Sequence, residues 1–480
     1  MSSGSDIVHV AFVPSAGFGH LGPCLRLAAL FLRHQHCHVT LITPKPTVSL
    51  AESHLISRFC SSFPSQVSQI DFQLLPFDPS TENSSDPFWL QFERIRRSVH
   101  LLIPILSSLS PPLNALIHDI SLISPMIPVS DSLAVPSYIY FVATARMFSF
   151  FSHLSVLDAA NKQAQGHPAS FIGDAVEIPG IRLPIPRSSI PPLLLQPGSL
   201  FEKIFMEDSP KLTKLDGIFI NTFDEVEAEA MAALNSGKVV PGLPPAHAVG
   251  PFMPCEFEKA PEEENSDGSL MKWLDGQPEG SVVYICFGNR TATTREQVKE
   301  MAEGLLQSGY RFLWVVKLKM VDKEDDEDLE QVLEPEVMKK IKEKGLVVKT
   351  WVNQGEILGH SSVGGFVNHG GWNSIVESIW NGVPVLSWGQ NGDQKITSEV
   401  AAESGAGIWP AEWGWGGEVV VKAEEIAKAV KEMMNNESLK LKVLQLKDAA
   451  RNAAAVGGSC DIKIKTIIEE LRKKKKKTVH

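Results

Sequence analysis

The chain has little of what marks secreted, membrane-spanning or nucleic-acid-binding proteins. Its six cysteines include no Cys-x-x-Cys pair, which suits reduced thiols rather than disulfides. No apolar run approaches the roughly 20 residues of a membrane-spanning helix, and the start lacks the basic residues and long apolar core of a secretory signal. Lys and Arg number 45 against 56 Asp and Glu, and the net charge of −11 argues against general binding to nucleic acid or anionic membranes. We expect a monomeric cytoplasmic protein with small-molecule partners.

Short apolar segments alternate with longer helical stretches in both halves of the chain. This alternation is typical of parallel sheets covered by helices, and 480 residues are enough for two domains. The sequence therefore predicts an α/β fold of two Rossmann-like lobes. The expected strands are 7–13, 38–43, 70–75, 114–118 and 137–141 in the first lobe, and 281–287, 312–317, 346–351, 363–368 and 383–388 in the second.

Pro, Glu, Asn and Gly concentrate between Pro241 and Ser269, as in a solvated linker. We therefore predict a first lobe at 1–245 and a second lobe at 246–460. The remaining segment, 461–480, is expected to form a helix with a basic tail that packs back on the first lobe. Open α/β sheets bind ligands beyond the carboxyl ends of their strands, so the two lobes are expected to face a central cleft.

A glycine-rich loop, Gly17 to Gly22, follows the first strand and reads GFGHLG. It matches the G-x-G-x-x-G fingerprint of dinucleotide-binding folds, but a nicotinamide site needs an acidic residue about 20 positions later. There is no Asp or Glu between Asp6 and Glu52. An NADP-type site using Lys45 remains a weaker alternative, so the loop alone does not predict a dehydrogenase.

His20 stands inside this loop, where a helix begins. The positive end of the helix disfavours the imidazolium, so a neutral His20 would be able to accept a proton as a general base. Asp119 ends the fourth expected strand, at the same edge of the sheet, and would orient the imidazole through its far ring nitrogen. The alternatives are a histidine that caps or packs under the helix and an aspartate that caps a turn.

The segment from Trp351 to Gln394 has the densest pattern in the chain, and reads WVNQGEILGHSSVGGFVNHGGWNSIVESIWNGVPVLSWGQNGDQ. It resembles the signature box of plant secondary-product UDP-glycosyltransferases over its whole length. The early G-x-G-H and the Asp119 position fit the same family. The resemblance implies the GT-B-type architecture and transfer of a sugar from UDP. The matched residues are Trp351, Gln354, His369, Gly371, Trp372, Asn373, Ser374, Glu377, Asp393 and Gln394.

The matched residues have chemistry suited to a UDP-sugar. Trp351 offers a face for uracil, while Gln354 and Glu377 suit ribose hydroxyls. His369 and the helix opening at Gly371 suit the diphosphate. Asp393 and Gln394 would hold sugar hydroxyls, and the terminal glutamine implies glucose rather than galactose. The resemblance adds four further donor-site candidates, Gly19, Asn289, Arg290 and Val352.

The box departs from the family pattern at Gly370, where cysteine is common, and at Gly389, where proline is usual. No metal ligand set is expected. Asp326-Glu327-Asp328 matches a D-x-D metal motif but sits in a charged loop, and the spacing around His34 and Cys37 fits no standard zinc site. We therefore expect no cofactor, with UDP-glucose as co-substrate and the leaving diphosphate stabilised by the helix end.

Two short segments, Asp86-Pro87-Phe88 and the FGNRTA at 287–292, look like the plant flavonoid C-glycosyltransferase branch. This resemblance implies inverting C-glucosylation of polyphenols such as 2-hydroxyflavanones or the dihydrochalcone phloretin. A simpler interpretation is that Asp86 caps a helix and Pro87 takes its first turn. Phenolic O-glucosylation and a non-catalytic nucleotide-sugar or polyphenol binder stay open as alternatives. The apolar candidates for the acceptor wall are Phe18, Phe88, Trp89 and Phe148, any of which could belong to the core.

Overall fold

The computed structural model describes residues 7–78, 87–161, 167–258, 268–288, 291–317, 329–350 and 352–478. The chain divides into two compact units, here called the first lobe (Met1–Lys259 with Asn452–His480) and the second lobe (Ala260–Arg451). None of the described helices is long and apolar enough to cross a membrane. All six cysteines are free thiols.

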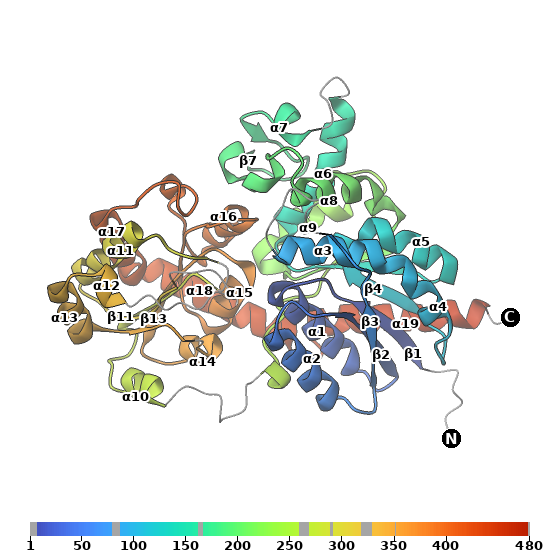
Figure 1. Ribbon diagram of the computed structural model, residues 1–480, viewed down its shortest axis with the longest axis horizontal. Coiled ribbons are helices and arrows are strands. Elements are labelled where there is room, and N and C mark those ends of the chain that lie inside the picture. The colour runs from blue at the N-terminus through green and yellow to red at the C-terminus, as the bar shows by residue number, and fades with distance from the viewer. Residues whose placement is uncertain are drawn as a thin grey trace. The chain divides into compact units, whose positions relative to one another are not determined.

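The first lobe is built on a parallel sheet whose seven strands run in the order β3-β2-β1-β4-β5-β8-β9. Strands β1, β2, β3 and β4 of this sheet are labelled in Figure 1. Its strands are β1 (Val8–Val13), β2 (Cys37–Lys45), β3 (Val67–Gln73), β4 (Ala115–Asp119), β5 (Ser137–Phe141), β8 (Gly217–Ile220) and β9 (Ala246–Ala248). A small antiparallel pair, β6 (Ala175–Val176) and β7 (Ile185–Pro186), stands apart from this sheet. The helices are α1 (Phe18–Leu32), α2 (Leu50–Ser62), α3 (Pro87–Ser98), α4 (Leu102–Ser107), α5 (Ile123–Leu133), α6 (Ala145–Ala160), α7 (Pro168–Phe171), α8 (Leu200–Asp208), α9 (Asp224–Asn235) and α19 (Ser459–Thr478).

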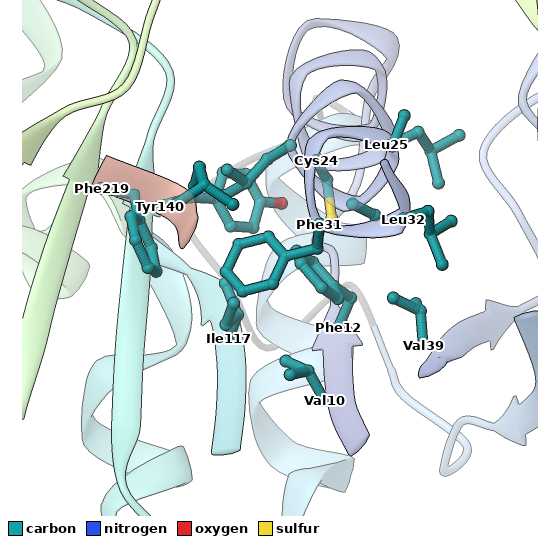
Figure 2. Packing of buried hydrophobic residues seen from close by; sticks show 14 of the residues in the cluster. Val10, Phe12, Cys24, Leu25, Phe31, Leu32, Val39, Ile117, Tyr140 and Phe219 are labelled. Carbon is teal, nitrogen blue, oxygen red and sulfur yellow. The ribbon is translucent and has the colours of Figure 1, made fainter. Parts of the chain in front are cut away.

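Continuous apolar strands explain the core of the first lobe. Every residue of β1 is buried, as expected for a central strand of a parallel sheet covered on both faces. The rings of Phe12 and Phe31 meet edge to face with centroids 5.7 Å apart, and Phe31 meets Phe219 in the same way at 5.9 Å (Figure 2). These contacts seat α1 on the sheet and fix the helix that carries His20.

The C-terminal helix α19 completes this core. Ile464, Ile467 and Leu471 are buried in the same hydrophobic cluster as Phe12 and Phe31. The Sγ of Cys460 also donates a hydrogen bond to the carbonyl of Val249 at 2.7 Å. The apolar face of α19 is therefore covered by the first lobe.

The second lobe repeats the design with a parallel sheet whose six strands run in the order β12-β11-β10-β13-β14-β15. Its strands are β10 (Val282–Cys286), β11 (Arg311–Val315), β12 (Gly345–Val348), β13 (Val363–Asn368), β14 (Val385–Ser387) and β15 (Gly407–Ile408). Its helices are α10 (Ser269–Asp275), α11 (Arg295–Ser308), α12 (Leu329–Val332), α13 (Pro335–Lys344), α14 (Gln354–Leu358), α15 (Trp372–Asn381), α16 (Gln394–Ser404), α17 (Ala423–Asn435) and α18 (Glu437–Ala454), the last of which runs past the end of this unit.

The predicted α/β class with two parallel-sheet lobes is confirmed, and each of the ten expected strands is present within a few residues. The lobe boundary differs from the expected 245. Residues Ala246–Ala248, which fall in the predicted linker, form β9 and pair with β8 at the edge of the first sheet. The first lobe therefore extends to Lys259.

Both sheets have the strand order of doubly wound folds, in which ligands bind where the chain direction across the sheet reverses. In the first lobe this switch point lies between β1 and β4, and in the second lobe between β10 and β13. Predicted site residues open α1 after β1, end β4 and follow β13, whereas Gln354 follows β12 and Asp393 and Gln394 follow β14.

Candidate functional site

The switch point of the first lobe brings His20 and Asp119 together. His20 lies in the first turn of α1, and Asp119 ends β4, which pairs with β1. The Nδ1 of His20 lies 2.8 Å from Oδ2 of Asp119. The His20 side chain is 23% exposed and that of Asp119 is fully buried. With Nδ1–H donating to the carboxylate, Nε2 is left as an acceptor, which is the arrangement that a general base requires.

Asp119 is fixed from its other side by Ser121, in the 3-10 turn η3 (Ile120–Leu122). The backbone N–H and the hydroxyl of Ser121 both donate to Oδ1 of Asp119, at 2.9 and 2.7 Å. Burial alone would raise the pKa of Asp119, but His20 and the Ser121 hydrogen bonds outweigh it and lower the pKa to about 2. Asp119 is therefore ionised throughout the neutral pH range.

The glycine loop is held by Glu52. Its carboxylate accepts hydrogen bonds from the backbone N–H of Gly17 at 3.1 Å and of Val48 at 3.2 Å. Gly17 has φ +90°, and a Cβ there would lie 2.2 Å from the ring of Phe88, so glycine is required. In a dinucleotide site the backbone N–H of this loop would bind a pyrophosphate. Here the N–H of Gly17 binds the carboxylate of Glu52 instead. The dehydrogenase alternative is weakened further.

Aromatic side chains surround His20. Its ring centroid lies 5.3 Å from that of Phe92 and 6.0 Å from that of Phe88, both on α3. Phe88 in turn contacts Trp89, with centroids 5.1 Å apart. Two of the four predicted wall residues, Phe88 and Trp89, therefore lie near the imidazole or contact a ring that does. Phe18, two residues before His20 on α1, is 42% exposed.

Phe148 does not share this position. It is fully buried and packs against Phe141 and Phe151, so we assign it to the core of the first lobe. Phe92, Glu52 and Ser121 were not predicted. Only Phe92 had a signal in the sequence, because it stands one helical turn after Phe88 and so shares its face of α3.

His118, one residue before Asp119, is expected to make the protein less stable in mild acid. It is fully buried between the carbonyl of Asp119 and the hydroxyl of Ser137, each 3.0 Å from a ring nitrogen. Burial lowers the pKa of His118 to about 4, against an ordinary value of 6.5. Below pH 6.5 this histidine is protonated in the unfolded chain but stays neutral in the folded chain. The free energy of unfolding therefore falls by about 3 kcal/mol as the pH drops from 6.5 to about 4.

Urea unfolding over this pH range measures the effect. His118→Gln should flatten the dependence of the unfolding free energy on pH, whereas the same change at the exposed His54 should not. An unaltered slope in His118→Gln would show that other groups cause the acid sensitivity.

The switch point of the second lobe places His369 beside two glycines. His369 follows β13, and Gly288 follows the neighbouring β10. A Cβ on Gly288 would lie 2.9 Å from the imidazole, and one on Gly371 would lie 2.4 Å from it. Burial lowers the pKa of His369 to about 4, so the ring is neutral at neutral pH. The two glycines allow the backbone to lie directly against this ring.

Helix α15 begins at Trp372, three residues after His369, and its first turn presents free backbone N–H groups suited to an anion. Gly371 is its N-cap and offers no side chain to the free backbone N–H groups. Within the described part of the chain, Nδ1 of His369 is buried without a hydrogen-bond partner, and so is Oδ1 of Asn373, which as an acceptor does not suit an anion. Buried polar atoms of this kind are rare in native proteins. A diphosphate would engage the N–H groups of α15 and the imidazole together.

Gly370 separates His369 from this helix. Its φ is +78°, and a Cβ would lie 2.3 Å from Oγ of Ser398 and 2.6 Å from the carbonyl oxygen of Gln394. The chain therefore uses glycine where the family that it resembles commonly has cysteine, and α16 packs closely against this loop.

Gln354 and Glu377 lie together, as their predicted common role requires. The Nε2 of Gln354, in the first turn of α14, donates to Oε2 of Glu377 at 2.8 Å and to Oγ of Ser374 at 3.2 Å. Glu377 lies on α15 and is 8% exposed. The two helices thus present a carboxylate and a carboxamide side by side, a suitable pair for the vicinal hydroxyls of a ribose.

Glu377→Ala is expected to weaken UDP binding by about 10- to 100-fold, because a hydrogen bond to a charged group contributes about 1.5–3 kcal/mol. Isothermal titration calorimetry measures the dissociation constant. The matched control is Glu356→Ala, an exposed glutamate on α14, which should bind UDP normally. Equal affinity for UDP in Glu377→Ala and the unmodified protein would remove Glu377 from the donor site.

Asp393 and Gln394 lie at the start of α16. Oε1 of Gln394 accepts hydrogen bonds from the backbone N–H groups of Gln390 and Asn391, both at 2.9 Å. Its Nε2 donates to the side chain of Asn391 at 3.3 Å. The glutamine oxygen thus supports the loop that contains Gly389, and Nε2 is the atom better placed to meet a sugar hydroxyl.

Some predicted residues lie outside the described residues: Asp86, Asn289, Arg290, Trp351 and the Asp326-Glu327-Asp328 motif. Of the remaining donor candidates, Gly19 is exposed in the first turn of α1, Val352 precedes α14, and Trp372 is buried at the start of α15. Pro87, exposed, begins α3. Among the described residues, no group of three or more His, Cys, Asp or Glu side chains has an arrangement suited to a metal ion.

Comparison with known proteins agrees with this geometry. Residues 258–452 match the family described as UDP-glucoronosyl and UDP-glucosyl transferase. UDP-glycosyltransferase 708D1 of Glycine max is 61% identical over 478 residues, covering 98% of this chain and 99% of that protein. The crystal structure of LpCGTa in complex with UDP is 40% identical with a TM-score of 0.82, covering 97% of this chain and 99% of that one.

A third relative binds the complete donor. The crystal structure of Medicago truncatula UGT71G1 complexed with UDP-glucose is 28% identical with a TM-score of 0.84, covering 98% of this chain and all of that one. The two α/β lobes, the switch-point sites and near full-length similarity to these proteins lead to one assignment: the chain is an enzyme of the plant UDP-glycosyltransferase family, with the GT-B fold.

Proposed function

We propose that this enzyme is an inverting, UDP-glucose-dependent C-glucosyltransferase that acts on flavonoid-type polyphenols, with His20 as its general base. The observation that carries the proposal is the 2.8 Å contact between His20 and the buried, ionised Asp119, set among the aromatic rings of α3. This combination suits deprotonation of a phenol bound against apolar walls.

The proposed chemistry begins at Nε2 of His20, which takes a phenolic proton from a trihydroxylated ring. Negative charge then spreads onto the ring carbon ortho to that oxygen. If this carbon lies about 3–3.5 Å from the anomeric carbon, it attacks in line with the departing diphosphate. A carbon–carbon bond forms and the bond from the anomeric carbon to UDP breaks. The ring carbon then passes its proton through water to the ring oxygen that was deprotonated first, which restores the aromatic phenol, and His20 releases its proton to solvent. One displacement converts the α-linked donor into a β-glucoside.

The second lobe would supply stabilisation for the leaving group. As the glycosidic bond breaks, the diphosphate becomes more negative, and the N-terminal N–H groups of α15 with His369 would stabilise that charge. We propose that this arrangement replaces a metal ion. Gln354 and Glu377 would hold the ribose, and Asp393 with Gln394 the glucose hydroxyls.

Two observations support the C-glucosyl assignment. The name of LpCGTa contains an abbreviation that we read as C-glycosyltransferase, and the sequence resembles the C-glycosyltransferase branch at Asp86-Pro87-Phe88 and from Phe287 to Ala292. The Medicago relative binds UDP-glucose, in agreement with glucose as the sugar.

Incubation with UDP-glucose and phloretin, followed by acid hydrolysis and NMR of the product, tests the proposal. An acid-stable glucoside with a carbon–carbon linkage is expected. A product that acid cleaves completely would replace C-glucosylation with phenolic O-glucosylation. UDP-glucose binding without turnover on any phenolic acceptor would instead indicate a non-catalytic binder.

A further inference from the structure

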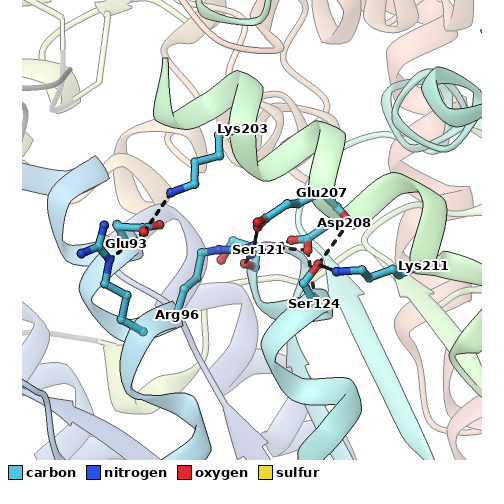
Figure 3. Close-up of polar contacts among 9 residues, drawn as sticks. Glu93, Arg96, Ser121, Ser124, Lys203, Glu207, Asp208 and Lys211 are labelled. Carbon is cyan, nitrogen blue, oxygen red and sulfur yellow. Dashed lines mark hydrogen bonds and ion pairs between the residues drawn. The ribbon is translucent and has the colours of Figure 1, made fainter. Parts of the chain in front are cut away.

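The site of the first lobe is backed by a buried polar network whose centre is Arg96 on α3. The Arg96 side chain is 6% exposed. Its Nη1 donates to the carbonyl of Ser121 and, at 2.7 Å, to Oδ2 of Asp208. Its Nη2 donates to the carboxylate of Glu207. Figure 3 shows Arg96 reaching between α8, which carries Glu207 and Asp208, and the turn that carries Ser121.

The partner of Arg96 is itself held in place. Asp208 is fully buried at the end of α8, and its Oδ1 accepts the backbone N–H of Ser124 at 2.9 Å. Burial alone would lower the pKa of Arg96, but the carboxylates of Asp208 and Glu207 outweigh it and raise the pKa. Burial also opposes ionisation of Asp208, yet we take it as ionised because a guanidinium lies 2.7 Å away. A buried charge pair of this kind fixes the position of both groups.

Ser121 connects this pair to the site. Its carbonyl accepts from Arg96, while its N–H and hydroxyl donate to Oδ1 of Asp119. Ser121 is therefore held by Arg96 through its carbonyl and by Asp119 through its N–H and hydroxyl. Because both Ser121 donors engage Oδ1, the other oxygen, Oδ2, is directed to His20.

If Arg96 had only a structural role, it would be to hold α3 against α8. Other residues also hold these two helices together. Lys203 on α8 lies 3.1 Å from Oε1 of Glu93 on α3. Trp89 and Phe201 also meet edge to face, with centroids 5.2 Å apart. Among the hydrogen bonds of the described residues, the one to the carbonyl of Ser121 comes from Arg96.

We propose that Arg96 is a positioning residue for catalysis, which acts through Ser121 to hold Asp119 in the orientation that directs His20. This inference rests on the proposed role of His20 as general base. Loss of Arg96 frees the Ser121 carbonyl and leaves Asp208 buried without its partner. Asp119 then loses the fixed donor pair that sets its orientation, and the imidazole loses its alignment to the acceptor.

The test compares Arg96→Met with Arg97→Met. Arg97 is the next residue on α3 and binds Glu93, with a half-exposed side chain. We expect Arg96→Met to lower kcat about 100-fold, a typical effect of misaligning a reacting group, while the KM for UDP-glucose stays unchanged. Arg97→Met should keep kcat. Arg96→Lys should restore little activity, because an ammonium cannot reach the carbonyl and both carboxylates in one plane.

Ser121→Ala covers the case in which Arg96→Met does not fold. This change removes one hydrogen bond to Asp119 and leaves the contacts between α3 and α8 intact, so thermal unfolding should be nearly unchanged and kcat should fall about tenfold. In an Asp119→Asn background, Arg96→Met or Ser121→Ala should cause no further loss of kcat, because the effect passes through Asp119.

The outcomes separate this proposal from the proposed function. Suppose that His20→Ala loses turnover while Ser121→Ala and a folded Arg96→Met keep full kcat. The role of His20 as general base is then supported, and the positioning role of Arg96 is wrong. The positioning role is also contradicted if, in the Asp119→Asn background, Arg96→Met or Ser121→Ala lowers kcat by the same factor as in the unmodified protein. If His20→Ala keeps turnover, both proposals fail.

Discussion

Replacing His20 with alanine is expected to lower kcat for glucosyl transfer by about 100- to 10,000-fold, the range over which general bases contribute. The dissociation constant for UDP should stay nearly unchanged, because the donor candidates other than Gly19 lie on loops and helices of the second lobe while the His20 side chain is on α1. Steady-state kinetics with phloretin and calorimetry with UDP measure the two quantities separately.

The matched control for this variant is His54→Ala, an exposed histidine on α2 of the same lobe, which should retain full activity. His20→Ala should still unfold in one cooperative transition, but at a lower temperature, because the buried Asp119 loses the imidazole that helps keep it ionised. A parallel fall in turnover and UDP affinity would show that His20 supports the structure rather than the chemistry.

Asp119→Asn is expected to lower kcat by about 1,000- to 10,000-fold although it changes almost nothing in size. The two Ser121 donors require an oxygen at the Oδ1 position. Asparagine has only one oxygen, so meeting this demand turns its amide NH₂ toward Nδ1 of His20. The imidazole must then accept at Nδ1 and carry its proton on Nε2, the tautomer that cannot take a proton from the acceptor.

NMR of the imidazole nitrogens provides the decisive comparison for this second variant. We expect the Nε2–H tautomer in Asp119→Asn and the Nδ1–H tautomer in the unmodified protein. Asp119→Ala, which removes the amide donor, should retain more activity than Asp119→Asn if the wrong tautomer is the main defect. An unchanged tautomer together with an unchanged kcat would show that Asp119 does not orient the base.

The sequence predicts the fold well where burial imposes a pattern on it. Strands β1, β5 and β13 are buried over all or nearly all of their length, so they read as mostly apolar runs that stand out from the helices. β9, only three residues of Ala-His-Ala, carries no such pattern. It lies in a proline-rich segment whose composition predicts a linker, and sheet pairing with β8 overrides that composition.

The site was predictable where its chemistry is local. His369 and the opening of α15 are neighbours in sequence, so the motif specifies them together. The supports of the first lobe are not local. Glu52 reaches Gly17 from α2, and Arg96 reaches Ser121 from α3. Such contacts depend on how the helices pack on the sheet. The residues that make them are far apart in the sequence, so no local motif predicts them. Phe148, a predicted wall residue, is buried among neighbouring rings by packing of the same kind, which its place in the sequence does not reveal.

A structure of the enzyme with UDP and phloretin bound tests the central claim most directly. We predict that Nε2 of His20 lies about 2.6–3.2 Å from a phenolic oxygen of phloretin, with the UDP diphosphate at the start of α15. A complex in which the phenol binds away from His20, or in which the diphosphate lies elsewhere than at His369 and α15, would contradict the account.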